Sequence, residues 1–331
     1  MRDIMVGKFD TEYQHHNRLG LHIFSNEDLH KIHAATLEVL EKTGIFVENA
    51  NALELFSGAG GIIDNKKKVV RIPPGLVEES IRSAPSKIVL AGRDPKHDKI
   101  LDGNQVFFTN FSEGIQVVDL YTGKRRTPVK SDLVNVARAV DFLSDVDICE
   151  KALSAHDVPQ EIAPLHNAEA FLSHTTKHCC FGPGNGMLLK KIVAMGAAIV
   201  GGVDRLEERP IISFTTCPVS PLKLINECCE IIMEAARSGL TVNILSMALA
   251  GGTSPVTLAG TLVTHNAEVL GGVVLNQLTS KGAPIIYGSS TTAMDLRLAA
   301  AAVGSPECAI ISGAVARLAR YYSLPSYVAG G

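Results

Sequence analysis

The sequence predicts an α/β fold of the (β/α)8 TIM-barrel type, incomplete here with about seven strands. From about Val129 onward, stretches with helical apolar spacing alternate with short apolar runs and with loops of Gly, Pro, Ser or Thr. The apolar runs alternate only weakly, which is typical of strands buried on both faces. No GxGxxG follows the first run, as an open nucleotide-binding sheet would require. The glycine-rich loop Gly182–Gly186 comes only after the third strand, and we interpret it as a tight turn.

Residues 1–104 do not follow this repeat and are expected to form an N-terminal α+β extension that packs on the barrel. Helices are predicted at Asn26–Thr43, with Ser25 as N-cap, and at Gly75–Ser83. Because no long linker rich in Ser, Gly or Pro follows, we expect residues 105–331 to form the barrel domain directly beside the extension.

The barrel domain is expected to contain seven strands and six helices, with a small hairpin after the first strand. The predicted helices are Ser131–Leu143, Ile162–Thr176, Gly186–Val200, Leu222–Ser238, Val256–Lys281 and Pro306–Tyr321. The predicted strands are Val106–Thr109, Val146–Leu153, His178–Phe181, Ile211–Thr215, Val242–Leu249, Ile285–Tyr287 and Leu324–Val328. The last four strands should be adjacent and parallel in one curved sheet, because helical crossovers join them.

Composition excludes several classes of protein. Lys and Arg number 31 against 34 Asp and Glu, for a net charge of -3, so neither a nucleic-acid surface nor a polybasic membrane patch is expected. The seven cysteines lack CxxC spacing, which favours reduced thiols in the cytoplasm. Charges scattered through the N-terminus argue against a signal peptide. Apolar stretches such as Ile192–Val203 are too short to cross a membrane.

Catalytic candidates lie where predicted strands end, because barrel enzymes place their chemistry at the carboxyl ends of strands. Glu113, after the first strand and beside Phe111, could neutralise an ammonium ion or relay a proton; a solvent-exposed loop carboxylate is the alternative. Asp157 follows the second strand, where it could act in the site or only shape a turn. Tyr287, in the sixth strand, could supply a cation–π wall or a proton, or could be a core tyrosine. We expect all three around one cavity near Gly331.

No metal site is predicted. His166, His174, His178 and the adjacent Cys179 and Cys180 form a group rich in metal ligands. However, the expected change from helix to strand near residue 177 points these side chains in different directions, and no CxxC or HExxH motif accompanies them. Lys151 in the second strand could suggest a Schiff-base aldolase, but a buried lysine paired with Glu150 or another acid is the commoner arrangement.

The C-terminal segment carries a specific resemblance. Residues 316–331, ARLARYYSLPSYVAGG, resemble the segment just before the pyrrolysine of the trimethylamine:corrinoid methyltransferases. Four further segments agree with that family: Asp119–Arg126, Asp157–Pro159, His174–Lys177 and Ala250–Leu258. The resemblance extends over essentially all 331 residues.

The resemblance implies a TIM-barrel enzyme that moves one methyl group from trimethylamine to the Co(I) centre of a cognate corrinoid protein and releases dimethylamine. The corrinoid is then carried by the partner, and the chain itself binds no cofactor directly. Pyrrolysine would be residue 332, encoded by an amber codon. We therefore expect the 331-residue chain to be inactive and the full-length protein to be a homo-oligomer. Gly251 and Gly252, after the fifth strand, could let the corrin ring approach closely, or could serve packing alone.

Two alternatives remain open from the sequence. One is a pyrrolysine-free relative that acts on a quaternary amine such as glycine betaine, which a sense codon after Gly331 would indicate. The other is a non-catalytic fragment that binds the corrinoid protein or itself, which an assay of the isolated chain would reveal.

Overall fold

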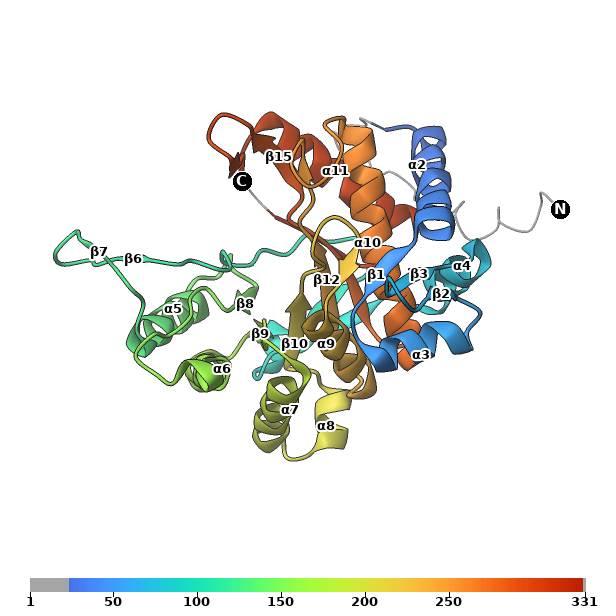
Figure 1. Cartoon of the computed structure of the whole chain (residues 1–331). Helices are drawn as coiled ribbons and strands as arrows, with labels where there is room; N and C mark the ends of the chain where they lie inside the picture. Colours follow the sequence, from blue (N-terminus) through green and yellow to red (C-terminus); the bar gives the residue numbers. More distant parts are fainter. Residues whose placement is uncertain (1–23, 330–331) are drawn as a thin grey trace.

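A six-stranded parallel sheet forms the centre of the computed structural model, which describes residues 24–329 (Figure 1). The strands lie in the order β17-β14-β12-β10-β9-β8. Their bounds are Ile148–Glu150 for β8, His178–Phe181 for β9, Ile212–Thr216 for β10, Val242–Ser246 for β12, Ile285–Ser289 for β14 and Ser326–Val328 for β17. All neighbours in this sheet pair in parallel, which confirms the predicted adjacency of the last four strands. The predicted first strand forms only a parallel bridge, from Thr109 to Ile148.

The six predicted helices are present: α5 precedes β8, and each of the other five follows a strand of this sheet. They are α5 (Lys130–Phe142), α6 (Ala163–His174), α7 (Gly186–Val200), α9 (Asn226–Arg237), α10 (Leu258–Thr279) and α11 (Pro306–Tyr321). The bounds of α7 and α11 agree with the prediction. Helix α9 begins four residues later than expected, because Lys223–Leu224 forms strand β11 instead. The short helix α8 (Val203–Glu208) was not expected.

Helix α10 is the central helix of the core. It has the length and hydropathy of a membrane-spanning helix, but 72% of its most apolar 18-residue window is buried inside the protein. It packs against α2, α4 and α9 as well as against β12. Core helices of this kind are apolar on all sides because protein surrounds them.

The N-terminal part lies against α10 and supplies its outer cover (Figure 1). Helix α2 (Asn26–Glu38) continues as a π-helical turn to Thr43, and Ser25, the predicted N-cap, forms a capping box with Asp28. The remaining elements are β1 (Ile45–Val47), α3 (Ala50–Gly58), β2 (Ile62–Asp64), β3 (Val69–Arg71), α4 (Pro74–Ser83), β4 (Ile88–Leu90) and β5 (Lys99–Leu101). Strand β1 pairs in parallel with β11 of the barrel part, so the two parts share a small sheet.

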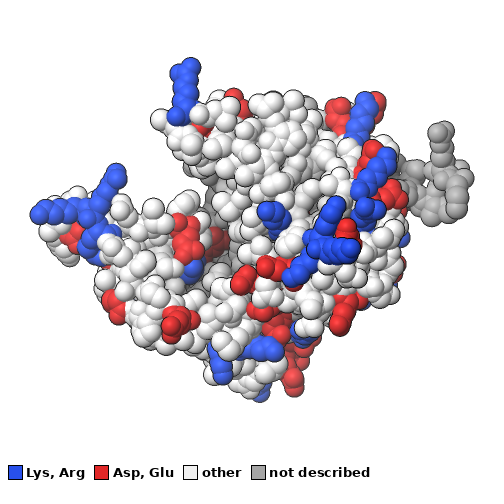
Figure 2. All heavy atoms as spheres, in the orientation of Figure 1, with Lys and Arg blue, Asp and Glu red and all other residues white. Residues whose placement is uncertain are grey.

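Two hairpins project at the end of the sheet where the strands finish (Figure 1). One consists of β6 (Val117–Val118) and β7 (Arg125–Arg126), the predicted hairpin. The other joins β15 (Thr292–Asp295) to β16 (Ala300–Ala301), beside the short strand β13 (Leu249–Ala250). Space-filling atoms show a hollow between the two projections (Figure 2).

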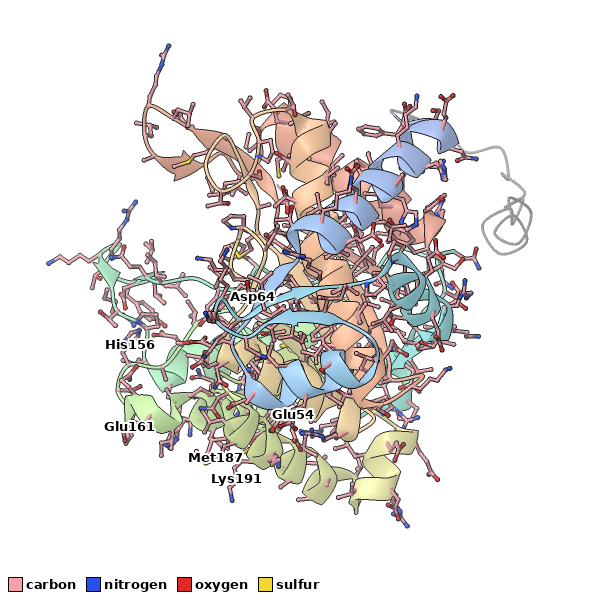
Figure 3. All side chains as sticks on the ribbon, turned by 45° about the vertical axis from the view of Figure 1, so that its right-hand side comes forward. Glu54, Asp64, His156, Glu161, Met187 and Lys191 are labelled. Atoms are coloured by element: carbon pink, nitrogen blue, oxygen red, sulfur yellow. The ribbon has the colours of Figure 1, made fainter. Side chains whose placement is uncertain are left out.

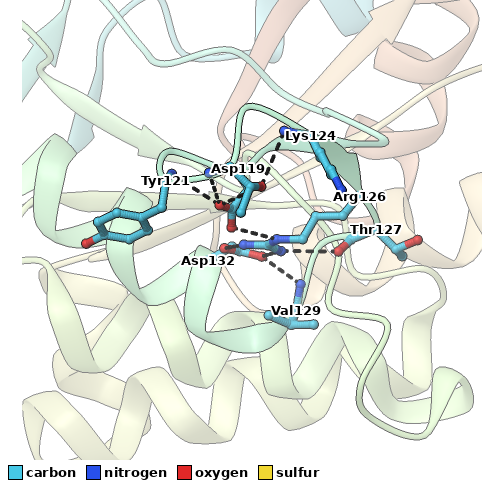
Figure 4. A network of polar contacts seen from close by, with 8 residues as sticks. Asp119, Tyr121, Lys124, Arg126, Thr127, Val129 and Asp132 are labelled. Carbon is cyan, nitrogen blue, oxygen red and sulfur yellow. Dashed lines mark hydrogen bonds and ion pairs between the residues drawn. The ribbon is translucent and has the colours of Figure 1, made fainter.

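Arg126 ties the β6–β7 hairpin to the start of α5 (Figure 4). Its guanidinium donates to the carboxylate of Asp119 in the hairpin and, through two nitrogens, to Asp132 in the helix. Asp132 also accepts from the backbone N–H of Val129 at 2.9 Å. The helix therefore begins at Lys130, and Asp132 closes its first turn from within, whereas the sequence had suggested Ser131 as the start.

Candidate active site

The strands of the sheet carry two kinds of side chain on their two faces. Residues that face the helices belong to the main hydrophobic core, as Cys149, Phe214, Ile244 and Tyr287 do. The alternate residues face the inside of the barrel. Ile148 and Ile286 pack there against Ile88 and Leu90. Most of the others are polar, with Cys180 next to Thr215 and Tyr327 next to Glu150. We call the following inward-facing residues the inner wall: Glu150, His178, Cys180, Ser213, Thr215, Asn243, Gly288 and Tyr327. Barrel interiors are usually filled by Val, Ile and Leu, so a polar inner wall indicates a site.

Glu150, the last residue of β8, is the most unusual member of the inner wall. It is only 6% exposed, and Oε2 accepts one hydrogen bond, from the hydroxyl of Tyr327 at 3.3 Å. No ion pair to its carboxylate is found in residues 24–329. Burial raises the pKa of Glu150 to about 7, although the hydrogen bond from Tyr327 works in the opposite direction. The group can therefore hold or release a proton at neutral pH.

The neighbours of Glu150 on the inner wall carry no charge at neutral pH. Burial raises the pKa of the Cys180 thiol to about 12 and lowers the pKa of His178 to about 4. Nδ1 of His178 faces the carbonyl oxygens of Ala91 and Pro210, so the proton sits there, and Nε2 accepts from Ser213. Both ring nitrogens of His178 are thus occupied. In the described part of the chain no three His, Cys, Asp or Glu side chains converge as metal ligands would.

Asn243 supplies a polar group of the inner wall that lacks a hydrogen-bond partner in the described residues. Its residue is 2% exposed, and the buried Oδ1 accepts no hydrogen bond within residues 24–329. A Cβ at Gly288 would lie 2.0 Å from this oxygen, so only glycine at that position leaves room for the amide. A buried acceptor without a donor costs about 1–3 kcal/mol, and a bound ligand that donates a hydrogen bond would remove this cost.

Glu113 lies at the mouth of the barrel, as predicted, but its charge is already compensated. Its Oε1 accepts from Nζ of Lys151 at 2.6 Å and from the hydroxyl of Ser154 at 2.6 Å. Burial alone would raise the pKa of Glu113, but the ammonium group of Lys151 and the two hydrogen bonds hold it below the ordinary value. Lys151, only 7% exposed, is thereby held as the partner of an acid, the commoner arrangement expected for a buried lysine.

Asp157 and Tyr287 lie away from the inner wall. Asp157 is exposed, and Oδ1 accepts from the backbone N–H of Lys130, so it binds the first turn of α5. Its neighbour His156 lies at the edge of the molecule on the same side as Glu161 (Figure 3). Tyr287 is fully buried on the helix-facing side of β14, where its hydroxyl donates to Oδ1 of Asn266 at 2.7 Å. The structure thus does not bring Glu113, Asp157 and Tyr287 around one cavity; Gly331 lies outside the described residues.

Gly251 and Gly252 form the tight turn after β13. Gly251 has φ +83, a conformation that side chains with a Cβ rarely adopt. A Cβ on Gly252 would lie 2.4 Å from the sulfur of Met294 in β15. Both glycines are therefore explained by the turn and by its packing, and their approach to a corrin ring stays a prediction.

Comparison with known proteins identifies the family. The sequence profile of the trimethylamine methyltransferase family matches residues 7–331. This chain belongs to that family. The relatives include a trimethylamine methyltransferase of Desulfitobacterium hafniense, 51% identical over 94% of this chain and 63% of its own length. One from Methanosarcina thermophila is 42% identical over 95% of this chain and 66% of its own length. The chain thus spans just under two thirds of the length of these relatives.

A glycine betaine methyltransferase of Desulfitobacterium hafniense is also similar, at 32% identity over 93% of this chain and 64% of its own length. Among solved structures, the monomethylamine methyltransferase of Methanosarcina barkeri superposes with a TM-score of 0.59 at 14% identity, over 90% of this chain and 60% of that one. A complex of the same type of enzyme with hydroxylamine gives a TM-score of 0.60 at 13% identity. At this identity the likeness concerns the fold, and it supports the predicted barrel architecture.

Proposed function

We propose that this chain is the amine-binding part of an enzyme that transfers a methyl group from trimethylamine to the Co(I) corrinoid of a partner protein. The observation that carries the proposal is membership of the trimethylamine methyltransferase family over nearly the whole chain. The polar inner wall supports the same function because it offers acceptors for an alkylammonium ion.

The reaction needs no external oxidant or reductant, because Co(I) acts as the nucleophile and is itself formally oxidised to Co(III). The C–N bond of trimethylammonium breaks with its electron pair left on nitrogen, and the methyl group bonds to cobalt through the electron pair of Co(I). The proton already on nitrogen stays with the dimethylamine product. The protein has to bind and orient the ammonium ion and exclude water, and alignment of this kind can contribute about 7 to 11 kcal/mol. The Glu113–Lys151 pair is suited to order the loop at the mouth.

The partner would dock on the rim of the barrel. Apolar side chains are exposed there on both hairpins and on the neighbouring loops: Phe111, Leu120, Tyr121, Met247, Val256, Leu296 and Leu298. So many exposed apolar side chains on one rim are typical of a surface that binds another protein. The seven cysteines are free thiols, which supports a cytoplasmic location.

The test is methylation of the corrinoid protein with trimethylamine as the donor. We expect methylation of the corrinoid protein by the full translated product of the gene. Glycine betaine is offered in parallel, because the 32% identical relative acts on that compound by its name. Methylation from glycine betaine alone would overturn the choice of substrate, and methylation from neither donor would overturn the function.

A further inference from the structure

We propose that Glu150 is a catalytic residue: its carboxylate receives the N–H of a trimethylammonium ion held on the inner wall beside Tyr327. This inference rests on the proposed function and deepens it, because it names the group that distinguishes a tertiary ammonium ion from a quaternary one. The sequence did not single out Glu150 as a site residue.

Charge distinguishes two glutamates at this end of the sheet. Glu113 and Glu150 both lie near the carboxyl end of β8, but Lys151 is committed to Glu113 at 2.6 Å. Glu150 has no cationic partner in residues 24–329, and its neighbours Cys180, His178 and Tyr327 are neutral at pH 7. The ionised inner wall is therefore negative by the one charge of Glu150, and a buried unpaired carboxylate favours the arrival of a cation.

The carboxylate of Glu150 also has unused capacity to accept hydrogen bonds. The carboxylate of Glu150 accepts a single hydrogen bond, although a buried carboxylate has room for about four. The backbone of Glu150 is held firmly, because the side-chain amide of Asn110 bonds to both its N–H and its C=O at 2.9 Å. The backbone of Glu150 is thus fixed, while its carboxylate has unused acceptor capacity. This arrangement suits a residue that binds a ligand better than one that stabilises the fold.

Glu150 and Tyr327 together match the shape and polarity of trimethylammonium. Trimethylammonium presents one N–H and three methyl groups. Tyr327 is half-buried on β17, and its hydroxyl bonds to the carboxylate of Glu150. Its aromatic ring therefore lies close to an ammonium ion bound at Glu150 and can contact the methyl groups. A quaternary ammonium ion has no N–H, and it would leave the carboxylate without that hydrogen bond. Sites built to bond an N–H discriminate strongly against analogues that lack it.

The protonation state of Glu150 should control the affinity for trimethylammonium. The carboxyl of Glu150 changes charge near neutral pH, and the groups that face it are Cys180 from β9, Tyr327 from β17 and Asn110 from the loop after the first strand. None of these is a cation. Below pH 7 the neutral acid can no longer pair with ammonium, so the affinity for trimethylammonium should fall about tenfold per pH unit.

The experiment measures binding of trimethylammonium chloride and tetramethylammonium chloride to the 331-residue chain by calorimetry, from pH 5.5 to 8.5. The variants are Glu150→Gln, which keeps the shape and the acceptor for Tyr327, Glu150→Asp as the conservative variant, and Tyr327→Phe. Glu208→Gln, an exposed acid beyond the amino end of the sheet, controls for net charge. Near-ultraviolet circular dichroism verifies the fold of each variant. Methyl transfer is then measured with the full translated product.

We expect wild type to prefer trimethylammonium over tetramethylammonium by at least tenfold, with affinity that rises with pH through 7. Glu150→Gln should lose this preference and the pH dependence, Glu150→Asp should keep part of both, and Tyr327→Phe should move the midpoint to higher pH. Glu208→Gln should behave as wild type.

Two outcomes separate the inference from the function on which it rests. If Glu150→Gln binds and transfers methyl groups as wild type does, the role of Glu150 is overturned and the transferase function stands. If binding depends on Glu150 while no form transfers a methyl group, the ammonium site stands and the transferase function is overturned. An absence of Glu150-dependent binding in both the chain and the full product overturns the inference as well.

Discussion

Two buried glutamates, one on each side of the sheet, have opposite surroundings. Glu268 on α10 is fully buried, and its carboxylate accepts from Ser220 at 2.8 Å, from Ser246 at 2.6 Å and from the backbone N–H of Leu222 at 3.0 Å. Glu150 on the inner wall accepts one hydrogen bond, at 3.3 Å. Burial raises the pKa of both groups. Burial and a raised pKa therefore do not mark a functional carboxylate; the number of fixed donors around it does.

The largest effect on stability is expected on the helix-facing side. Glu268→Ala removes the acceptor of three buried donors, and we expect the free energy of unfolding to fall by about 3 to 5 kcal/mol. Unfolding in urea, with Glu208→Ala as the exposed control, measures the change. A loss below about 1 kcal/mol would mean that the three donors find other partners, and the contrast with Glu150 would then disappear.

The inner wall should show itself through pH. The pKa of Glu150 is about 7 in the folded chain against 4.5 as its ordinary value, so the folded state holds the proton more tightly. Its stabilising contribution is complete below pH 4.5 and is lost as pH rises through 7, by about 3 kcal/mol in total. Glu150→Gln should remove this slope.

The measurement compares the free energies of unfolding of wild type and Glu150→Gln at pH 4.5, 6 and 8. Glu268 titrates in both proteins and cancels in the difference, because it is present in each. Equal slopes for the two proteins would show that Glu150 is ionised in the folded chain, with a donor or cation near it.

The fold followed from the sequence more closely than the site did. Helical spacing and the apolar runs predicted the strand order, and Ser25 was correct as a cap because capping is local. Helix α3 was missed, since its apolar positions span only nine residues. Strands β15 and β16 were missed because their pairing depends on contact with the distant β13.

The choice of site residues failed for a reason of geometry. Asp157 was chosen because it follows a strand, and Tyr287 because it lies at the end of one. However, successive residues of a strand lie on opposite faces, so position along the chain alone does not tell which face a residue occupies. Tyr287 is one step away from the inward-facing Gly288, and Glu150 one step from the core residue Cys149. A signal was available: Glu150, Cys180, Ser213, Thr215 and Asn243 are polar residues at alternate positions of buried strands.

A smaller effect is expected from the network around Tyr287. Its hydroxyl donates to Asn266, whose amide nitrogen in turn bonds to Tyr322 at 2.7 Å and to Thr36 at 2.9 Å. Tyr287→Phe leaves one buried acceptor unpaired, and we expect a loss of about 1 to 2 kcal/mol in the free energy of unfolding. Chemical unfolding measures it. A change in the affinity for trimethylammonium without a change in stability would instead return Tyr287 to the site.

The smallest effect is expected at the rim, from Asp157→Ala. Oδ1 of Asp157 accepts at 2.8 Å from the backbone N–H of Lys130, the first residue of α5, and one such bond at an exposed helix start is worth about 1 kcal/mol or less. Water can take the place of the exposed Asp157 carboxylate as acceptor, whereas Glu268 is fully buried and its donors would be left without one. Asp157→Asn keeps an oxygen acceptor and should restore most of the stability, which makes it the matched control. Thermal unfolding measures both variants, and calorimetry with trimethylammonium measures binding. If Asp157→Ala instead weakens binding tenfold while unfolding at the wild-type temperature, the carboxylate contacts the amine, and the separation of a structural rim from a binding inner wall is wrong.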